Sequence, residues 1–202
     1  HTSHRIDLAA MVAHGRRMGS LIGTDITQGA GLIPYDVQAP EVDFSVSTSL
    51  KWMCGTPGAG VLYLSPRLIG HCHPELRGWV SQAHPFNWDI TAFSYAPDIR
   101  RFDNGTPGVM AAIASLPALE WHARQSQSAL LAHNRRLTAR LIDMADGFGL
   151  ALLTPRDEAR RGGSIMLRLP DDHPAADVVA GLRAKGITTD HRSQTLRLSP
   201  GI

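Results

Sequence analysis

One lysine, Lys51, is the residue whose type and setting best fit a chemical role. A lysine amine that has lost its proton forms a Schiff base with a carbonyl group. The residues just before it are rich in hydroxyl groups: Ser45, Ser47, Thr48 and Ser49. Hydroxyl groups and glycine amides are suited to binding a phosphate. We therefore interpret Lys51 as the carrier of pyridoxal phosphate, although a loop lysine taken alone is more often an ordinary surface residue.

Asp25 is the partner that such a cofactor requires. It follows a short apolar run, residues 20–24, which we expect to form a buried parallel strand. The carboxyl ends of parallel strands are where α/β sheets bind ligands, and an acidic side chain keeps a pyridine nitrogen protonated. The alternative is an aspartate that caps the next turn. Gln28 is either a donor to the phenolic oxygen of the cofactor or an ordinary turn residue.

The segments around this pair predict a sheet with a helix beside it. Residues 6–18 have the spacing of an amphipathic helix, with cationic residues in the last turn. Residues 42–48 predict the next strand and residues 60–65 a third one. The link between these two strands is too short for a parallel crossover, so we expect them to be antiparallel.

The second half of the chain predicts a different architecture. Residues 66–107 are irregular by composition, and a loop region this long is usually functional or covers something. A helical pattern follows from Val109 to about Ala145, with a break or restart at Pro117. Its predicted apolar stripe consists of Leu130, Leu137, Leu141 and Met144. Beyond it we expect a small α+β unit, with strands at residues 150–153, 164–169, 186–189 and 195–198 and a helix at 174–185.

The composition is that of an ordinary globular protein. The chain has 202 residues, of which 43% are hydrophobic and 19% charged, and its formal net charge is +2. It has no basic block of the kind that nucleic acid binding requires. Two groups of arginines are interpreted as solvated. They are Arg135, Arg136 and Arg140 on a helix face, and Arg160 and Arg161 in a loop.

The two cysteines, Cys54 and Cys72, provide neither a disulfide framework nor a metal-ligand cluster. We therefore expect a reducing, cytoplasmic setting and no metal. No apolar run has the length of a membrane span, and no signal peptide is visible.

Three segments together resemble the class V aminotransferase family: D-I-T-Q-G-A-G from Asp25, residues 42–51, and K-W-M-C-G-T-P-G-A-G-V-L-Y from Lys51. This family consists of pyridoxal-phosphate enzymes of the aspartate aminotransferase fold, including cysteine desulfurases and kynureninases. The resemblance implies an α/β fold with a mostly parallel sheet. It implies part of a large cofactor-binding domain over residues 1–115, a connecting helix over 116–146, and part of a small α+β domain over 147–202.

Within the family the sequence most resembles kynureninases. The similar segments are R-G-W at 77–79, R-R-F-D-N-G-T-P at 100–107, L-L-T-P-R-D-E-A-R-R-G-G-S at 152–164 and G-I-T-T-D-H-R-S-Q-T-L-R-L-S-P at 186–200. The resemblance implies that Thr48 and Trp79 contact the phosphate, and that Thr106 reaches it from a partner subunit. It also implies that Arg197 binds the substrate carboxylate. The alternatives are a core position for Trp79, a turn position for Thr106 and a buried salt bridge for Arg197.

Two residues depart from the kynureninase pattern. Gln28 stands where kynureninases tend to have histidine, and Leu50 where they tend to have tyrosine. Glutamine is the desulfurase residue, but a desulfurase also needs a mobile cysteine in its small domain, where neither Cys54 nor Cys72 lies. The family's large domain begins well before His1 and its small domain continues past Ile202. We therefore expect an incomplete chain without the loop that cups the phosphate and without the aromatic residue that stacks on the pyridine.

These residues predict an enzyme that acts on a small amino-acid substrate. The kynureninase-like outcome is hydrolytic Cβ–Cγ cleavage of an aryl-keto amino acid. The alternatives are a class V aminotransferase, a cysteine desulfurase or β-lyase, and a relative without catalytic activity. We also expect a homodimer with a shared active site, in which residues 66–107 reach the neighbouring subunit, and we expect no nucleic acid or membrane partner.

Overall fold

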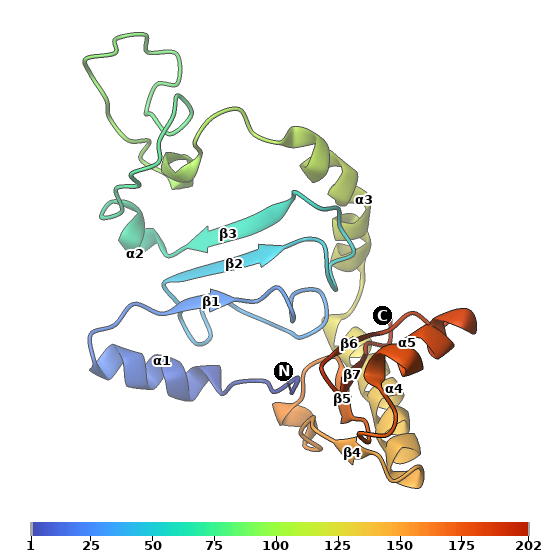
Figure 1. Cartoon of the computed structure of the whole chain (residues 1–202). Helices are drawn as coiled ribbons and strands as arrows, with labels where there is room; N and C mark the ends of the chain where they lie inside the picture. The colour runs from blue at the N-terminus through green and yellow to red at the C-terminus, as the bar shows by residue number, and fades with distance from the viewer. Residues whose placement is uncertain (1, 202) are drawn as a thin grey trace. The chain divides into compact units, whose positions relative to one another are not determined.

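The computed structural model describes residues 2–201 and divides into two compact units (Figure 1). The first, called here the lysine unit, consists of Met11–Thr27 and Asp36–Leu119. The second, the C-terminal unit, consists of the N-terminal residues up to Ala10, Gln28–Tyr35 and the chain from Glu120 onward. Among residues 2–201, no helix is both long and apolar enough to cross a membrane. The domain boundaries expected from the family resemblance stay a prediction.

The lysine unit is built on a three-stranded sheet of order β1-β2-β3. Its strands are β1 (Gly23–Asp25), β2 (Phe44–Thr48) and β3 (Gly60–Leu64). As predicted, β1 is parallel to β2, and β3 is antiparallel to it (Figure 1). The first strand was wrongly expected at residues 20–24 and buried: it begins at Gly23, and its residues alternate between exposed and half-buried. The residues before it close the preceding helix: the Gly19 and Ser20 N–H groups donate to carbonyls of that helix, and Gly19 has a φ of +68°.

A buried carboxylate anchors the start of β2. The Asp43 side chain is fully buried and accepts hydrogen bonds from Arg16 Nη1 at 2.5 Å and from the Ile22 backbone N–H at 2.6 Å. Arg67 forms an ion pair with its other oxygen. These contacts join the helices α1 (Leu8–Arg17) and α2 (Pro66–Ile69) to the sheet. A buried charge is stable only when it is paired and hydrogen-bonded, so Asp43 fixes the position from which β2 runs toward Lys51.

The segment 66–107 is irregular, as predicted, apart from α2 and the 3-10 helix η1 (Ile99–Phe102). Its centre is the buried side chain of Arg101. The guanidinium donates from Nε to the Ala96 carbonyl at 2.9 Å and from Nη1 to the Cys72 carbonyl at 2.8 Å. It also lies 5.6 Å from the centroid of the Tyr95 ring. One cation thus satisfies loop carbonyls that no regular structure would pair.

Two helices lead into the C-terminal unit: α3 (Val109–Arg124) and α4 (Gln127–Gly147). The helical prediction is confirmed, but the break lies at residues 125–126 and α3 continues through Pro117. Ser126 caps α4, because its side chain accepts the Ala129 N–H at 3.3 Å. The predicted stripe on α4 is partly wrong, since Met144 is 50% exposed and Ile142 and Ala145 are the buried apolar residues.

The C-terminal unit contains a four-stranded sheet of order β4-β5-β7-β6 in which all neighbours are antiparallel. Its elements are β4 (Ala151–Leu152), the 3-10 helix η2 (Glu158–Arg160), β5 (Ile165–Arg168), α5 (Ala175–Ala184), β6 (Asp190–Arg192) and β7 (Thr195–Leu198). Ile165 and Leu167 of β5 pack with Ile142 and Ala145 of α4 to form its core. The expected α+β unit is therefore present.

The strand predicted at residues 186–189 is wrong, and helix capping explains why. The Gly186 N–H donates to the Arg183 carbonyl and the Ile187 N–H to the Leu182 carbonyl, both at 2.9 Å. Gly186 has a φ of +79°, which is the left-handed conformation that ends many helices. The backbone of these residues closes α5, so β6 begins only at Asp190.

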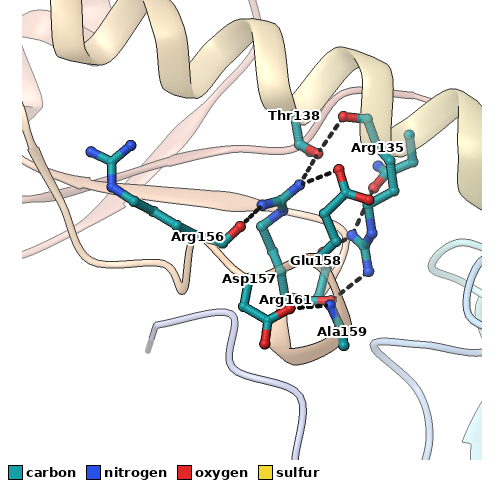
Figure 2. A network of polar contacts seen from close by, with 9 residues as sticks. Arg135, Thr138, Arg156, Asp157, Glu158, Ala159 and Arg161 are labelled. Atoms are coloured by element: carbon teal, nitrogen blue, oxygen red, sulfur yellow. Dashed lines mark hydrogen bonds and ion pairs between the residues drawn. The ribbon is translucent and has the colours of Figure 1, made fainter.

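Two arginines that were expected in solvent are buried in the C-terminal unit. Arg135 of α4 is 7% exposed and Arg161 is 1% exposed. Arg135 donates to the carbonyls of Gly162 at 2.7 Å and of Arg161 at 2.6 Å. Arg161 donates to the Arg156 carbonyl at 2.7 Å and lies beside Thr138 and Glu158 (Figure 2). Burial, and next the charge of Arg161, lower the pKa of Arg135. Free carbonyls of the loop after β4 therefore draw both side chains inward.

Candidate cofactor site

Asp25 is held in its ionised form at the carboxyl end of β1. Its Oδ1 accepts the Thr27 backbone N–H at 2.9 Å. The hydrogen bonds of the Thr27 side chain and backbone lower the pKa of the Asp25 carboxyl below its ordinary value. The residue is exposed, so burial opposes this effect only slightly. An exposed carboxylate that stays charged at neutral pH is suited to a protonated ring nitrogen.

The end of β2 lies beside the same turn. Because β1 and β2 are parallel, their carboxyl ends meet at one edge of the sheet. The contact is direct: the Thr48 backbone N–H donates to Thr27 Oγ1 at 3.3 Å. The Thr48 side chain is on the exposed face of β2. Asp25, Thr27 and Thr48 thus form one group of polar side chains immediately before Lys51.

Lys51 lies on the loop that leaves β2, and its side chain is exposed. The Lys51 carbonyl accepts the Cys54 N–H at 2.9 Å, which closes a turn. Within residues 2–201, no hydrogen bond or ion pair engages the Lys51 amine. No carboxylate thus occupies the Lys51 amine, and its role as the carrier of the cofactor stays a prediction.

A cluster of three hydroxyls lies under this loop, and sequence analysis did not identify it. Ser115 of α3 accepts the Thr56 backbone N–H at 2.9 Å, and the two hydroxyl oxygens are also 2.9 Å apart. Ser49 Oγ lies 3.3 Å from Ser115 Oγ and donates to the Thr56 carbonyl at 3.0 Å. We call Ser49, Thr56 and Ser115 the hydroxyl cluster. Its only sequence signal is a serine within the apolar run of α3.

Trp79 and Thr106, both expected at the phosphate, lie in one neighbourhood of the irregular segment. A β-carbon on Gly78 would lie 1.4 Å from the Asn104 carbonyl oxygen, so the backbones around residues 78 and 104 are in close contact. A β-carbon on Gly105 would lie 3.8 Å from Trp79 Nε1. Trp79 is 39% exposed and Thr106 is exposed. In the described chain no hydrogen bond joins these two residues to the group around Asp25, so their phosphate role stays a prediction.

Gln28 and Arg197 belong to the C-terminal unit. Gln28 is exposed. Arg197 of β7 stands opposite Asp190 of β6, and its Nε donates to Asp190 Oδ1 at 2.7 Å while Nη2 pairs with the second oxygen. The two side chains are 40% and 54% exposed. Arg197 therefore has a carboxylate partner in two-pronged geometry, although the pair is half-exposed rather than buried.

The donor set of the lysine unit fits pyridoxal phosphate. It offers an exposed amine, an ionised carboxylate and a hydroxyl at neighbouring strand ends. Among residues 2–201, no group of three or more histidine, cysteine, aspartate or glutamate side chains could hold a metal ion. The exposed amine, the carboxylate and the hydroxyl are groups that a cofactor with a carbonyl, a ring nitrogen and a phosphate requires.

Comparison with known proteins gives the same result. The model of the family "Aminotransferase class-V" matches residues 4–195. A kynureninase from Deinococcus radiodurans is 32% identical over 197 residues, which cover 95% of this chain and 47% of the relative. A probable cysteine desulfurase from Streptomyces coelicolor is 32% identical over 182 residues, or 88% of this chain and 42% of the relative. The chain spans about half the length of the curated relatives it matches.

A solved structure shows the fold. It is a C-DES variant with glycine covalently linked to its PLP cofactor, with a TM-score of 0.86 and 22% identity, covering 99% of this chain and 53% of the other. The expected cofactor, pyridoxal 5′-phosphate, is the cofactor of this fold and family. The chain belongs to the class V aminotransferase family and has the fold of type I pyridoxal-phosphate enzymes.

Proposed function

We propose that this chain carries the catalytic lysine of a pyridoxal-phosphate enzyme that acts on an amino acid, with a kynureninase-like hydrolytic Cβ–Cγ cleavage as its reaction. The observation that carries the proposal is the edge of the sheet where β1 and β2 end together. There the ionised Asp25 is linked through Thr27 to Thr48, and Lys51 follows with a free amine.

Each residue has a separate task in this proposal. When bound, the cofactor withdraws electrons from the α-carbon of the substrate. The Lys51 amine holds the cofactor and accepts the α-proton, and Asp25 keeps the ring nitrogen protonated. Gln28 donates to the phenolic oxygen. Thr48 and Trp79 bind the phosphate, and Thr106 reaches it from a partner subunit.

Substrate recognition falls to Arg197. Its guanidinium already binds the Asp190 carboxylate with two prongs, which is the geometry an amino-acid carboxylate needs. Both side chains are partly exposed, and exposed ion pairs are weak. A substrate carboxylate can therefore replace Asp190 at small cost.

The alternative reaction is cysteine desulfuration. Gln28 and the equal identity to a probable cysteine desulfurase favour it. Neither Cys54, which is exposed in the loop after Lys51, nor Cys72 lies on the C-terminal unit, where a desulfurase would need its mobile thiol. The products distinguish the reactions. Kynureninase-like hydrolysis gives an aromatic carboxylic acid and transamination gives a keto acid, whereas desulfuration leaves a protein persulfide that an added thiol reductant releases as sulfide. A relative without catalytic activity would give none of these products.

The assembly and setting belong to the same proposal. We infer a homodimer, because aromatic residues of the irregular segment such as Phe86 and Trp88 are 71% and 79% exposed and would be covered by a second subunit. A monomer that is fully active in sedimentation experiments would contradict this. Two free cysteines fit a reducing, cytoplasmic setting.

Borohydride reduction of the protein loaded with cofactor tests the central claim. The chain has only two lysines, Lys51 and Lys185, so each can be replaced in turn. The pyridoxyl label is expected on the Lys51 peptide in the unaltered protein and in Lys185→Arg, and absent in Lys51→Arg. A label on Lys185, or no label at all, would refute the proposal.

A further inference from the structure

We propose that Ser115 of α3 is a positioning residue for Lys51, because it fastens the loop that carries the lysine to the helix. This inference rests on the proposed role of Lys51. The loop, residues 49–60, is called here the lysine loop. Its link to α3 runs through the hydroxyl cluster of Ser49, Thr56 and Ser115.

The fastening is made of complementary donors and acceptors. The Ser115 oxygen accepts the Thr56 backbone N–H at 2.9 Å, and its own hydroxyl lies 2.8 Å from the Ala111 carbonyl. The Thr56 hydroxyl donates to the same carbonyl at 2.9 Å. Ser115 is 1% exposed, so water cannot replace it as the acceptor for Thr56. Without the serine oxygen, the partly buried Thr56 N–H would lose its hydrogen-bond acceptor, which is costly.

Further backbone hydrogen bonds within the loop connect its attachment on α3 to Lys51. The Ser49 N–H donates to the Ala59 carbonyl at 3.0 Å, and the Gly55 N–H donates to the Ser49 carbonyl at 2.7 Å. The Cys54 N–H then donates to the Lys51 carbonyl at 2.9 Å. Ser115 is therefore linked to Lys51 by one hydrogen bond to Thr56, the backbone of residues 54–56 and one hydrogen bond from Cys54 to the Lys51 carbonyl. A shift of the loop on α3 would move the amine relative to Asp25.

The cluster must be close-packed to work, and Gly55 makes this possible. A β-carbon on Gly55 would lie 2.5 Å from Ser49 Cβ and 3.0 Å from Ser115 Oγ. Any side chain would push the loop away from α3 and break the cluster. The cluster also contains no formal charge, so it orients Lys51 without attracting or repelling the proton that the amine must exchange. Catalytic groups need such support to hold a productive geometry.

The experiment separates fastening from positioning by two measurements on Ser115→Ala. In protein without cofactor, amide hydrogen exchange of the lysine loop is expected to be about tenfold faster, while the β2 peptides keep their rate, because the partly buried Thr56 N–H loses its acceptor. In protein with cofactor, both the pH midpoint of the cofactor absorbance and the rate of borohydride reduction at Lys51 are expected to change. If Ser115 only stabilised the fold, the pH midpoint of the absorbance and the rate of reduction would both stay unaltered.

Two further variants keep the test decisive. Thr56→Val removes only the threonine hydroxyl and retains the N–H bond to Ser115, so it should give a smaller change of the same kind and serves if Ser115→Ala fails to fold. The double variant should add little to Ser115→Ala, because both residues act in one cluster. Thr154→Val is the matched control. It removes a buried hydroxyl that accepts the Met166 N–H at 2.8 Å in the C-terminal unit, and should change neither measurement.

The outcomes distinguish this inference from the proposed function. Unchanged exchange of the lysine loop in Ser115→Ala would overturn the fastening. Faster exchange with an unaltered cofactor absorbance and reduction rate would overturn the positioning role and leave Ser115 a stabilising residue. If the unaltered protein takes up no cofactor at Lys51, the proposed function and the positioning role both fail, whatever the exchange shows.

Discussion

The tripeptide Asp-Ile-Thr occurs twice in the lysine unit, at residues 25–27 and 89–91, and both copies form the same turn. Asp25 Oδ1 and Asp89 Oδ1 each accept the N–H of the threonine two residues on, at 2.9 Å. In both copies the threonine side chain and backbone lower the pKa of the aspartate. Three residues are therefore enough to lower the pKa of an exposed aspartate.

What differs is where the turn is attached. The first copy is joined to β2 twice. The Ile26 N–H donates to the Val46 carbonyl at 2.9 Å, and Thr27 Oγ1 accepts the Thr48 N–H. In the second copy Ile90 is 99% exposed, and the turn lies in the irregular segment. Local sequence thus lowers the pKa of each aspartate, whereas the sheet determines which of them is joined to the strand that leads to the lysine.

The largest test of this contrast uses another matched pair, the neighbours Arg160 and Arg161. Arg161→Met is expected to lower the free energy of unfolding by about 3 kcal/mol, because a buried guanidinium that donates to Arg156 and Thr138 is lost. Arg160 is exposed, so Arg160→Met should change it by less than about 0.5 kcal/mol. Urea unfolding measures both. Equal losses of unfolding free energy in the two variants would show that the contribution of an arginine depends on its residue type rather than on its position.

A second test replaces the two aspartates. Asp25→Asn is expected to weaken cofactor binding by roughly 10–100-fold, since a charged hydrogen bond to the ring nitrogen becomes a neutral one. Asparagine can still accept the Thr27 N–H, so the turn survives. Asp89→Asn has the same local chemistry and should leave cofactor affinity unchanged. Fluorescence titration with pyridoxal phosphate gives both values, and similar affinities for the two variants would remove Asp25 from the site.

The smallest effect is expected from the threonines. Thr27→Ala and Thr91→Ala should each raise the pKa of the neighbouring aspartate toward its ordinary value, as followed by carboxyl NMR resonances. A lowered folded-state pKa stabilises the protein above the unfolded pKa, and this contribution disappears as the pH falls through the folded value. Any stability lost in these variants should therefore be visible at neutral pH and vanish in acid. A pKa that moves in only one variant would show that the turns are not equivalent.

Much of the fold could be predicted because it depends on neighbours in sequence. The short link between β2 and β3 required an antiparallel pair, and the resemblance around Asp25 and Lys51 gave the family and cofactor. Errors arose where backbone groups distant in sequence determined whether a side chain is buried. Arg135 and Arg161 read as solvated because nothing in a sequence shows that free carbonyls of residues 156–162 will face α4.

The candidate site divides in the same way. Asp25 and Lys51 were predicted from their residue types, which carry the chemistry, and their roles stay predictions. Ser115 was missed because its role depends on Thr56, which lies 2.9 Å away but far back in the chain. The contacts of Trp79 and Thr106 with a phosphate stay predictions, as does the release of Arg197 from Asp190.

The absence of space at Gly55 also restricts how this loop can vary in evolution or in the laboratory. Substitutions there would separate Ser49 from Ser115 before they could alter any substrate contact. Pro57, whose side chain is exposed, offers more freedom than Cys54. Cys54 has a φ of +55°, which favours glycine or asparagine as replacements. Libraries meant to change the specificity of this enzyme class should therefore keep Gly55 constant and place their diversity beside it.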